Sequence, residues 1–336
     1  MIKVGLIGCG FMGGMHAACY KALEDLGVKV TAVADKRPSF GKEIADKYGA
    51  ELYETGMELI EKADVDVVDV CLPTHLHVEH AVAAMKAGKN VFVEKPICIK
   101  EEEMELIAKT EKETGAKVQI GQVIRLWTEY KWLKDVADSG EYGRVLCGSF
   151  RRLSSRPEWA SEGWLHKAEL SGGLAVDMHV HDVDFVRYLL GEPDRVQADA
   201  YRDEDGLIQQ IYVVYGYGKD VAITIEAGWN YPATYPFNAG YRVKFEKAAV
   251  VFDAGVVTVY PNEGEPFHPE MGEEFKGDND IGGNISSLGG YYNELKYFVE
   301  GLKGEHPLEV ATVDEAIKSV KLVKKEIEVA GGLWRK

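Results

Sequence analysis

Strand and helix signals alternate along the first 122 residues of the chain. Apolar β-rich runs and helical patterns take turns over residues 2–8, 12–26, 28–35, 38–49, 65–73, 75–89, 90–96, 100–115 and 117–122. This alternation with short connections predicts a parallel sheet wrapped by helices. The near-continuous apolar character of VDVVDVCL and NVFV fits strands that are buried on both faces.

The pattern changes after Gln122, where we expect the domain boundary. Helical patterns and long alternating runs follow at residues 127–138, 175–190, 195–202, 207–218, 220–229, 241–253, 256–261, 290–301 and 313–330. Alternating runs separated by turns predict a largely antiparallel sheet. The chain is therefore expected to be an α/β protein with two domains, residues 1–122 and 123–336.

Composition narrows the class of function. The 336 residues carry a formal net charge of -16, which argues against nucleic-acid and anionic membrane partners, because both reward Lys/Arg patches. The five cysteines form no CxxC pair, and the first residues lack the long apolar core of a signal peptide. We expect a cytoplasmic protein that handles small molecules.

The stretch VGLIGCGFMG contains the motif Gly8-x-Gly10-x-x-Gly13 between the first strand and the first helix. In this context Gly8 permits a tight turn, Gly10 lets the backbone approach a pyrophosphate, and Gly13 lets helix and strand pack closely. The helix start offers unpaired N–H groups to the phosphates. A dinucleotide cofactor is therefore expected here, and residues 1–122 are expected to form an NAD(P)-binding Rossmann domain.

Asp35 ends the second strand, 22 residues after Gly13. An acid at about this spacing accepts hydrogen bonds from the adenosine ribose and repels a 2′-phosphate, which favours NAD. Lys36 and Arg37 follow directly, and either could pair with a 2′-phosphate, so NADP stays possible. Contacts to the cofactor are expected from Gly8, Gly10, Phe11, Met12, Gly13, Asp35, Lys36, Arg37, Leu72, Pro73, Thr74, His77, Glu94 and Lys95.

The stretch NVFVEKPI ends a buried strand with Glu94-Lys95-Pro96. Ligands of open α/β sheets bind beyond the carboxyl ends of the strands, so Lys95 could stabilise a developing alkoxide. The tripeptide alone fits a surface salt bridge equally well. In CLPTHLH, Thr74 is a candidate contact to the cofactor, whereas capping or packing suits His75 and His77 better than metal binding.

These pieces in this order resemble the glucose–fructose oxidoreductase/inositol dehydrogenase family, Gfo/Idh/MocA. The matching stretches are GLIGCGFMGGMH, VADK, CLPTHLHVEHAVAAMKAGKNVFVEKP and GGLAVDMHVHDVDFVRYLLGEP. The resemblance implies a Rossmann domain followed by a substrate-binding and oligomerisation domain on a large open sheet, through which homodimers or homotetramers form. It also implies that Lys95, Asp177 and His181 are the catalytic set. His179 departs from the family, where a small or apolar residue is common.

The implied reaction is hydride transfer between a secondary hydroxyl of a sugar, sugar derivative or cyclitol and nicotinamide. His181 suits the hydroxyl proton because the ordinary pKa of histidine lies near neutrality. Asp177 lies four residues earlier and shares its helix face. Further substrate contacts are expected from Arg125, Trp127, Tyr130 and Trp164, with Arg152, Arg156, Trp159 and His166 in the same polar and aromatic stretches.

Three other readings stay open. The protein could oxidise a glycoside transiently with retained NAD, it could be a non-catalytic NAD-binding regulator, or His179 and His181 could bind a metal. We expect no metal, because a helix at residues 175–190 would turn the two histidine rings apart. On that helix Asp184 is expected to give structural support, and the roles of Asp182 and His179 stay undecided.

Overall fold

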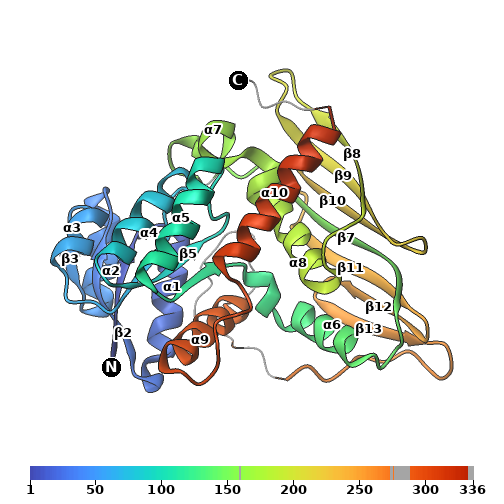
Figure 1. The fold of residues 1–336 in the computed structure, drawn as a ribbon, viewed down its shortest axis with the longest axis horizontal. Helices are drawn as coiled ribbons and strands as arrows, with labels where there is room; N and C mark the ends of the chain where they lie inside the picture. The colour runs from blue at the N-terminus through green and yellow to red at the C-terminus, as the bar shows by residue number, and fades with distance from the viewer. Residues whose placement is uncertain (159, 273–274, 276–287, 332–336) are drawn as a thin grey trace. The chain divides into compact units, whose positions relative to one another are not determined.

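The computed structural model describes residues 1–158, 160–272, 275 and 288–331 (Figure 1). These residues group into two compact units. The first contains Met1–Trp127 together with a later segment that ends at Ile317, and the second contains the residues from Thr128 up to that segment and those from Lys318 on. The predicted boundary near residue 122 stays a prediction, and it did not include a return of the chain to the first unit. Trp159 lies outside the described residues.

The first unit is built on a parallel sheet of six strands in the order β3-β2-β1-β4-β5-β6. The strands are β1 (Ile2–Ile7), β2 (Val28–Ala34), β3 (Glu51–Tyr53), β4 (Val67–Val70), β5 (Asn90–Glu94) and β6 (Val118–Gly121). Val4 pairs with Val30 on one side and with Val67 on the other. Because the strand order reverses between β1 and β4, a crevice for a ligand is expected beyond their carboxyl ends.

Helices cover both faces of this sheet, as predicted. They are α1 (Phe11–Ala22), α2 (Pro38–Tyr48), α3 (Gly56–Lys62), α4 (His77–Lys86), α5 (Glu101–Thr114) and α9 (Gly289–Lys303). α1 contacts α2 and α9, whereas α4 contacts α3 and α5, which gives one helical layer on each face. The strands between them are buried on both sides, because all four residues of β4 are buried.

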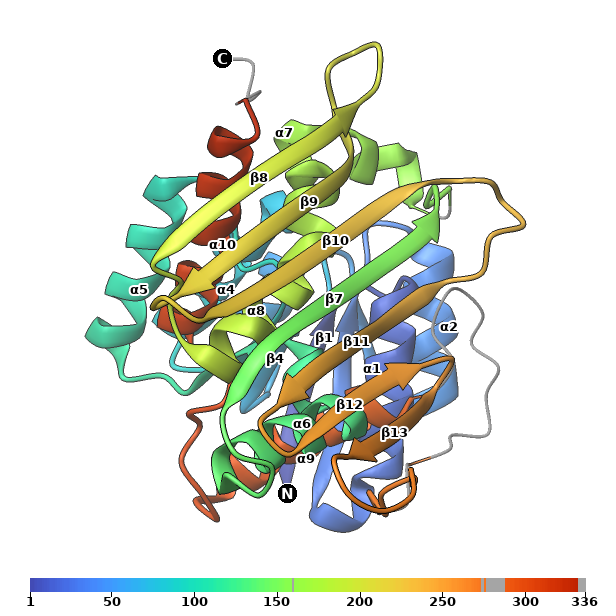
Figure 2. The same cartoon turned by 90° about the vertical axis from the view of Figure 1, so that its right-hand side faces the viewer.

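The second unit is built on a seven-stranded sheet in the order β13-β12-β11-β7-β10-β9-β8 (Figure 2). The strands are β7 (Val145–Ser155), β8 (Arg195–Arg202), β9 (Ile208–Tyr217), β10 (Val221–Tyr231), β11 (Asn238–Phe245), β12 (Ala248–Asp253) and β13 (Val256–Pro261). Neighbours run antiparallel except β7 and β10, which are parallel. The prediction of a mostly antiparallel open sheet is confirmed.

One face of this second sheet packs on helices. They are α6 (Thr128–Ser139), α7 (Ala168–Ser171), α8 (Val180–Leu190) and α10 (Val313–Val329), and a π-helical turn, Ala175–His179, runs directly into α8. Buried aromatic rings fill the layer between them. The Tyr130 ring lies 4.9 Å from Phe185 and 5.3 Å from Tyr241, both edge-on. No described helix is long and apolar enough to span a lipid bilayer.

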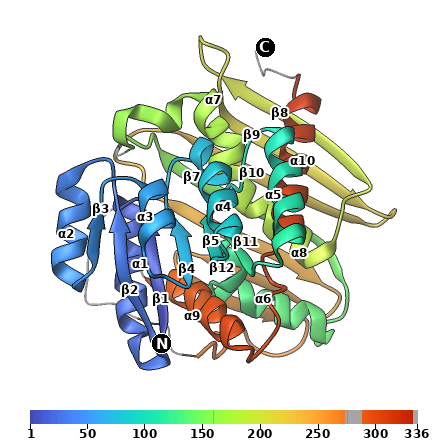
Figure 3. The same ribbon diagram turned by 60° about the vertical axis from the view of Figure 1, so that its left-hand side comes forward.

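Several elements were not predicted from the sequence. β3 is a three-residue strand at the edge of the first sheet beside β2 (Figure 3), and α3 follows it, capped by the Thr55 side chain. β7 lies at the centre of the second sheet, but polar residues interrupt its apolar alternation. Residues 241–253, predicted as one run, form a hairpin of β11 and β12.

Candidate functional site

The glycine motif forms a closed turn at the end of β1. Gly8 has a φ of +92°, and a Cβ on it would lie 2.4 Å from the carbonyl oxygen of Cys71. A Cβ on Gly13 would lie 1.8 Å from the carbonyl oxygen of Gly8. No side chain larger than hydrogen fits either position without moving backbone. The helix that follows begins at Phe11, so its first N–H groups face the space beyond the turn.

Asp35 lies directly after β2, and its carboxylate is held in place by hydrogen bonds. Backbone N–H groups of Cys9 and Arg37 each donate to it at 2.8 Å, and the Arg37 guanidinium donates to both its oxygens at 3.0 Å. Burial opposes ionisation, but the hydrogen bonds from Arg37 and Cys9 outweigh it and lower the pKa of Asp35. Arg37 also lies over the Phe40 ring at 4.0 Å. Lys36 is exposed.

The loop after β4 carries the next group of predicted cofactor residues. Leu72 and Pro73 are half-buried, and Thr74 is buried with a hydroxyl that has no hydrogen-bond partner among the described residues. The His77 ring lies between the carbonyl oxygens of Leu72 and Pro96, at 2.7 and 2.8 Å. Burial lowers the pKa of His77. This ring therefore ties the loop after β4 to the loop after β5.

β5 ends at Glu94, and Lys95 follows it with a half-buried side chain. The Glu94 carboxylate is buried and accepts the backbone N–H of Lys95 at 3.1 Å. The peptide bond between Lys95 and Pro96 is cis. The carboxyl ends of β1, β4 and β5 are adjacent in the sheet. Gly8, Thr74 and Lys95 therefore belong to one edge of the first unit.

Asp177 and His181 belong to the second unit and lie one turn apart. Asp177 is within the π-helical turn, His181 is in the first turn of α8, and both side chains are half-buried. In a π turn, hydrogen bonds span five residues, so residues four and five apart lie above each other. The expectation that Asp177 and His181 share a face therefore agrees with the backbone geometry, although the turn is π-helical rather than α-helical.

The other titratable groups of this segment have buried partners. Asp182 pairs with Arg152 of β7 at 2.8 Å, and Asp184 accepts the Ser319 hydroxyl of α10 at 2.7 Å. His179 is fully buried, and its Nε2 lies 2.9 Å from the Glu326 carboxylate of α10. That the ring of His179 turns away from His181 stays a prediction, and the contact of Asp184 with Ser319 agrees with its expected support role.

The predicted substrate residues fall in different surroundings. Arg125 is buried in the first unit, where it donates to the carbonyl of Val310 and lies 3.7 Å from Glu315. Trp127 lies against Gly290 of α9. Tyr130, predicted as a substrate contact, instead has no exposed surface, because aromatic rings of the second unit enclose it. Trp164 is half-buried in a 3-10 helix of the second unit.

A pocket opens in the second unit at the start of the helix that carries Asp177 and His181. Its enclosed space is about 40 Å³, and Leu174 and Ala175 form part of its wall. Trp229 and His166 also line it, with their rings 6.1 Å apart and edge-on. Trp229 donates its indole N–H to Gln209 at 3.0 Å. His166 was a sequence candidate, whereas Trp229 and Gln209 were not.

Sequence reasoning missed a cluster of buried polar residues in the first unit. His16 on α1, Asp69 on β4 and Glu294 on α9 are all fully buried. The available signal was a charged residue within the apolar strand VVDV and a histidine in the largely apolar first turns of α1. Their contacts join segments far apart in the chain, which spacing alone does not reveal.

The family model described as an oxidoreductase family with an NAD-binding Rossmann fold matches residues 2–122, and the GFO/IDH/MocA C-terminal domain model matches residues 130–251. The chain is 33% identical over 194 residues to myo-inositol 2-dehydrogenase of Thermotoga maritima, covering 57% of this chain and 55% of that protein. It is 29% identical over 218 residues to 2,7-anhydro-N-acetylneuraminate hydratase of Mediterraneibacter gnavus, covering 62% and 57%. The chain thus matches little more than half the length of these curated relatives.

The fold is also that of solved structures. Levoglucosan dehydrogenase, in complex with NADH and levoglucosan, has a TM-score of 0.82 at 20% identity, with 98% of this chain and 97% of that chain covered. A similarity at this identity shows the fold. The family is shown by the two family models, which match residues 2–122 and 130–251: the chain belongs to the Gfo/Idh/MocA family of NAD-binding oxidoreductases.

Proposed function

We propose that the protein is an NAD-dependent dehydrogenase that transfers a hydride between a secondary hydroxyl of a sugar or cyclitol and nicotinamide. The pair of Asp177 and His181 carries this proposal. In a segment rich in titratable groups, Asp177 and His181 are half-buried, whereas His179, Asp182 and Asp184 are fully buried. That division is the one expected when two groups serve a ligand and the others hold the helix.

The first unit fits a dinucleotide. A Cβ on Gly8 or Gly13 would collide with backbone, so the turn is as tight as a pyrophosphate site requires. The buried Thr74 hydroxyl lacks a partner in the described structure and could meet a polar group of the cofactor. The ionised Asp35 favours NAD, because a carboxylate accepts from ribose hydroxyls and repels a phosphate. Arg37 already pairs with Asp35, which supports the same preference.

The bound nicotinamide supplies the hydride acceptor. We assign the remaining chemistry to three side chains of this protein. His181 accepts the hydroxyl proton, Asp177 orients the imidazole or a neighbouring substrate hydroxyl, and Lys95 donates to the oxygen on which negative charge develops. Lys95 belongs to the first unit, and Asp177 and His181 belong to the second.

The pocket at Leu174 and Ala175 supports a ring-shaped polyol as substrate. The Trp229 and His166 rings offer apolar faces to C–H groups, and Gln209 with Arg156 offers hydrogen bonds to hydroxyls. The names of the relatives point the same way, because inositol and levoglucosan are both compact rings that carry several hydroxyl groups. We propose that this pocket holds the part of the substrate away from the reacting carbon.

We further propose that two or four copies assemble through the open face of the second sheet. β9 alternates, so Tyr212 and Val214 are exposed on one face while Val213 and Tyr215 are buried on the other. Exposed apolar residues on a continuous sheet face are typical of interfaces. Sedimentation of the purified protein tests this assembly, and a monomer at micromolar concentration would refute it.

The five free cysteines agree with a reducing compartment such as the cytoplasm.

The test is a spectrophotometric screen for NADH formation with inositols, free sugars and glycosides. We expect turnover with at least one compact polyol and a loss of about 100-fold or more in kcat for Lys95→Ala and His181→Ala. Lys109→Ala, on the exposed face of α5, is the matched control and should retain activity. Wild-type turnover in Lys95→Ala or His181→Ala would overturn the assignment.

A second candidate is favoured by the similarity to a hydratase. In this reading the protein oxidises a glycoside transiently, and the hydride returns to the product, so no net NADH appears. The same residues serve both reactions. Purified protein that carries NAD and converts a glycoside without added cofactor would support this candidate over the first.

A further inference from the structure

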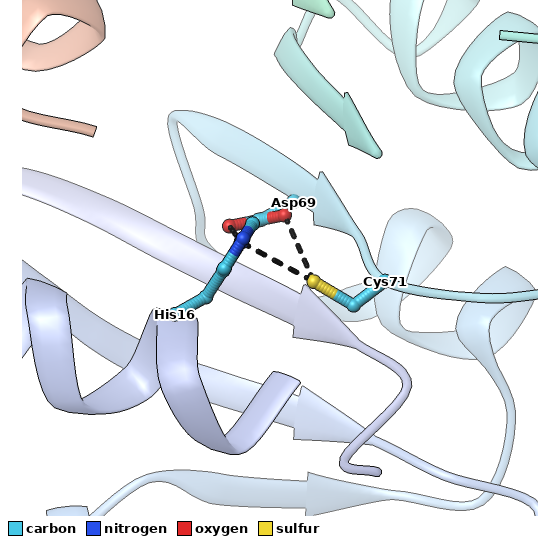
Figure 4. A group of neighbouring side chains, drawn as sticks. All are labelled: His16, Asp69 and Cys71. Atoms are coloured by element: carbon cyan, nitrogen blue, oxygen red, sulfur yellow. Dashed lines mark hydrogen bonds and ion pairs between the residues drawn. The ribbon is translucent and has the colours of Figure 1, made fainter. Parts of the chain in front are cut away.

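A buried polar cluster lies beneath the dinucleotide turn of the first unit. Nδ1 of the His16 ring of α1 lies 2.8 Å from the Asp69 carboxylate of β4 (Figure 4). Its Nε2 lies 3.0 Å from the Glu94 carboxylate of β5. The Cys71 thiol lies 3.3 Å from Nδ1. The centroids of the His16 and Phe92 rings lie 5.4 Å apart, and the two rings are edge-on to each other. The cluster joins a helix and two strand ends that are distant in sequence.

The hydrogen-bond geometry favours a doubly protonated His16 ring. A neutral imidazole has one N–H and one lone pair, so one nitrogen would face a carboxylate lone pair. Both ring nitrogens lie within hydrogen-bond distance of carboxylate oxygens, which fits a ring that carries both protons. Burial alone would lower the pKa of His16, but Asp69 and Cys71 raise it well above its usual value.

Glu294 of α9 completes the cluster from the opposite side. An oxygen of its carboxyl group, a ring nitrogen of His16 and a Glu94 oxygen all lie within 4.8 Å of one another. The side chain is fully buried, and neither oxygen has a hydrogen-bond partner among the described residues. A third buried carboxylate beside one imidazolium would be uncompensated, which is costly. Burial and the nearby Glu94 raise the pKa of Glu294 well above its usual value.

The cluster reaches Lys95 through one residue. The same carboxyl group of Glu94 that faces His16 accepts the Lys95 backbone N–H at 3.1 Å with its other oxygen. Gly121 of β6 leaves room for it, because a Cβ there would lie 3.2 Å from the Glu94 carboxyl atoms. The orientation of Glu94 therefore depends on His16 and in turn fixes the backbone at Lys95.

We propose that His16 is a positioning residue for Lys95: as an imidazolium between Asp69 and Glu94 it fixes the end of β5, while the adjacent Glu294 is a neutral acid. This rests on the proposed role of Lys95. Titratable groups reach His16 from four elements: Cys19 and Tyr20 of α1, Asp69 and Cys71 at the end of β4, Glu94 of β5, and Tyr291 and Glu294 of α9. The Cys71 thiol is not a candidate nucleophile in this cluster. Burial and the nearby Asp69 raise the pKa of the thiol well above its usual value, so little of the reactive thiolate forms.

Two matched variants test the charge assignment. Glu294→Gln replaces a neutral acid with a neutral amide and should keep kcat within about twofold of wild type, whereas Glu94→Gln removes a carboxylate from the imidazolium and should lower kcat about tenfold or more. The KM for NAD should change less than kcat in Glu94→Gln, because the glycine turn and Asp35 are untouched. Thermal unfolding of both variants separates this effect from loss of folding.

The protonation state of His16 can also be measured in the wild-type protein, so this test does not depend on whether a variant folds. In nitrogen NMR of protein labelled at the histidine rings, His16 should show two protonated ring nitrogens throughout the neutral pH range. A neutral His16 tautomer, an equal loss of kcat in both variants, or a stoichiometric metal ion in the purified protein would overturn the proposal. These results concern the cluster alone, so they stay distinguishable from failure of the substrate screen, which would refute the proposed function.

Discussion

The ion pair of Arg152 and Asp182 offers a test of how the segment with Asp177 and His181 is held. Arg152 Nε lies 2.8 Å from one Asp182 oxygen, and its Nη2 lies 3.2 Å from the other. The side chains are 3% and 0% exposed. Arg152→Met keeps most of the side-chain volume but leaves the Asp182 charge buried without its partner. Removal of one partner from such a pair typically costs about 3–5 kcal/mol of the free energy of unfolding.

The assay is urea unfolding followed by fluorescence, with the free energy extrapolated to water. Arg151→Met is the matched control, because the neighbouring Arg151 pairs with Asp253 at a surface where the side chains are 31% and 57% exposed. That substitution should cost less than about 1 kcal/mol. The double variant Arg152→Met/Asp182→Leu should recover most of the loss, because no uncompensated charge remains. A cost below about 1 kcal/mol for Arg152→Met, or a double variant no more stable than the single, would refute the reasoning.

Two further predictions concern the cofactor and pH. Asp35→Ser should lower kcat/KM for NAD by about tenfold and raise it for NADP, because Arg37 loses its carboxylate partner and becomes available to a 2′-phosphate; steady-state kinetics with both cofactors checks this, and an unchanged ratio contradicts it. The pKa of Glu326 is raised above its ordinary 4.5 by burial, which outweighs the nearby His179. A carboxyl group whose pKa is raised by folding stabilises the fold at pH values below its pKa in the unfolded chain. This contribution is lost as the pH rises through its pKa in the folded protein. The free energy of unfolding of Glu326→Gln should therefore rise relative to that of wild type as pH rises from about 4.5 toward neutral. Unfolding curves at several pH values measure this difference, and a difference that does not change with pH would contradict the prediction.

The local features of the site could be predicted from sequence because the chain carries them in short windows. The glycine turn, Asp35 after β2 and Lys95 after β5 each depend on a strand followed by a few residues. The four-residue spacing of Asp177 and His181 likewise survives whether the turn is α or π.

The supporting contacts could not be predicted, because they join residues far apart in the chain. His179 meets Glu326 across 147 residues, and His16 meets Asp69 across 53. Tyr130 is a different case, because it was predicted to contact substrate and is instead part of the core. Its aromatic ring and hydroxyl fit a sugar site as well as a core, and only packing against Phe185 and Tyr241 decides between them. β7 was missed because its place at the centre of a sheet comes from its neighbours rather than its own alternation.

The π-helical turn at Ala175–His179 holds one residue more than a regular helix would need, and this makes the segment sensitive to length. Deletion of Met178 would restore ordinary helical pairing, and the residues after it would keep nearly the same orientation because the turn loses only its extra residue. His179, Asp182 and Asp184 could then keep their buried partners, whereas Asp177 and His181 would be three residues apart in sequence and about 60° apart around the helix axis. We expect such a deletion to retain helix content by circular dichroism and to lose turnover, and an active deletion variant would show that the extra residue is dispensable. The same segment should accept substitutions far more readily than a change in its number of residues.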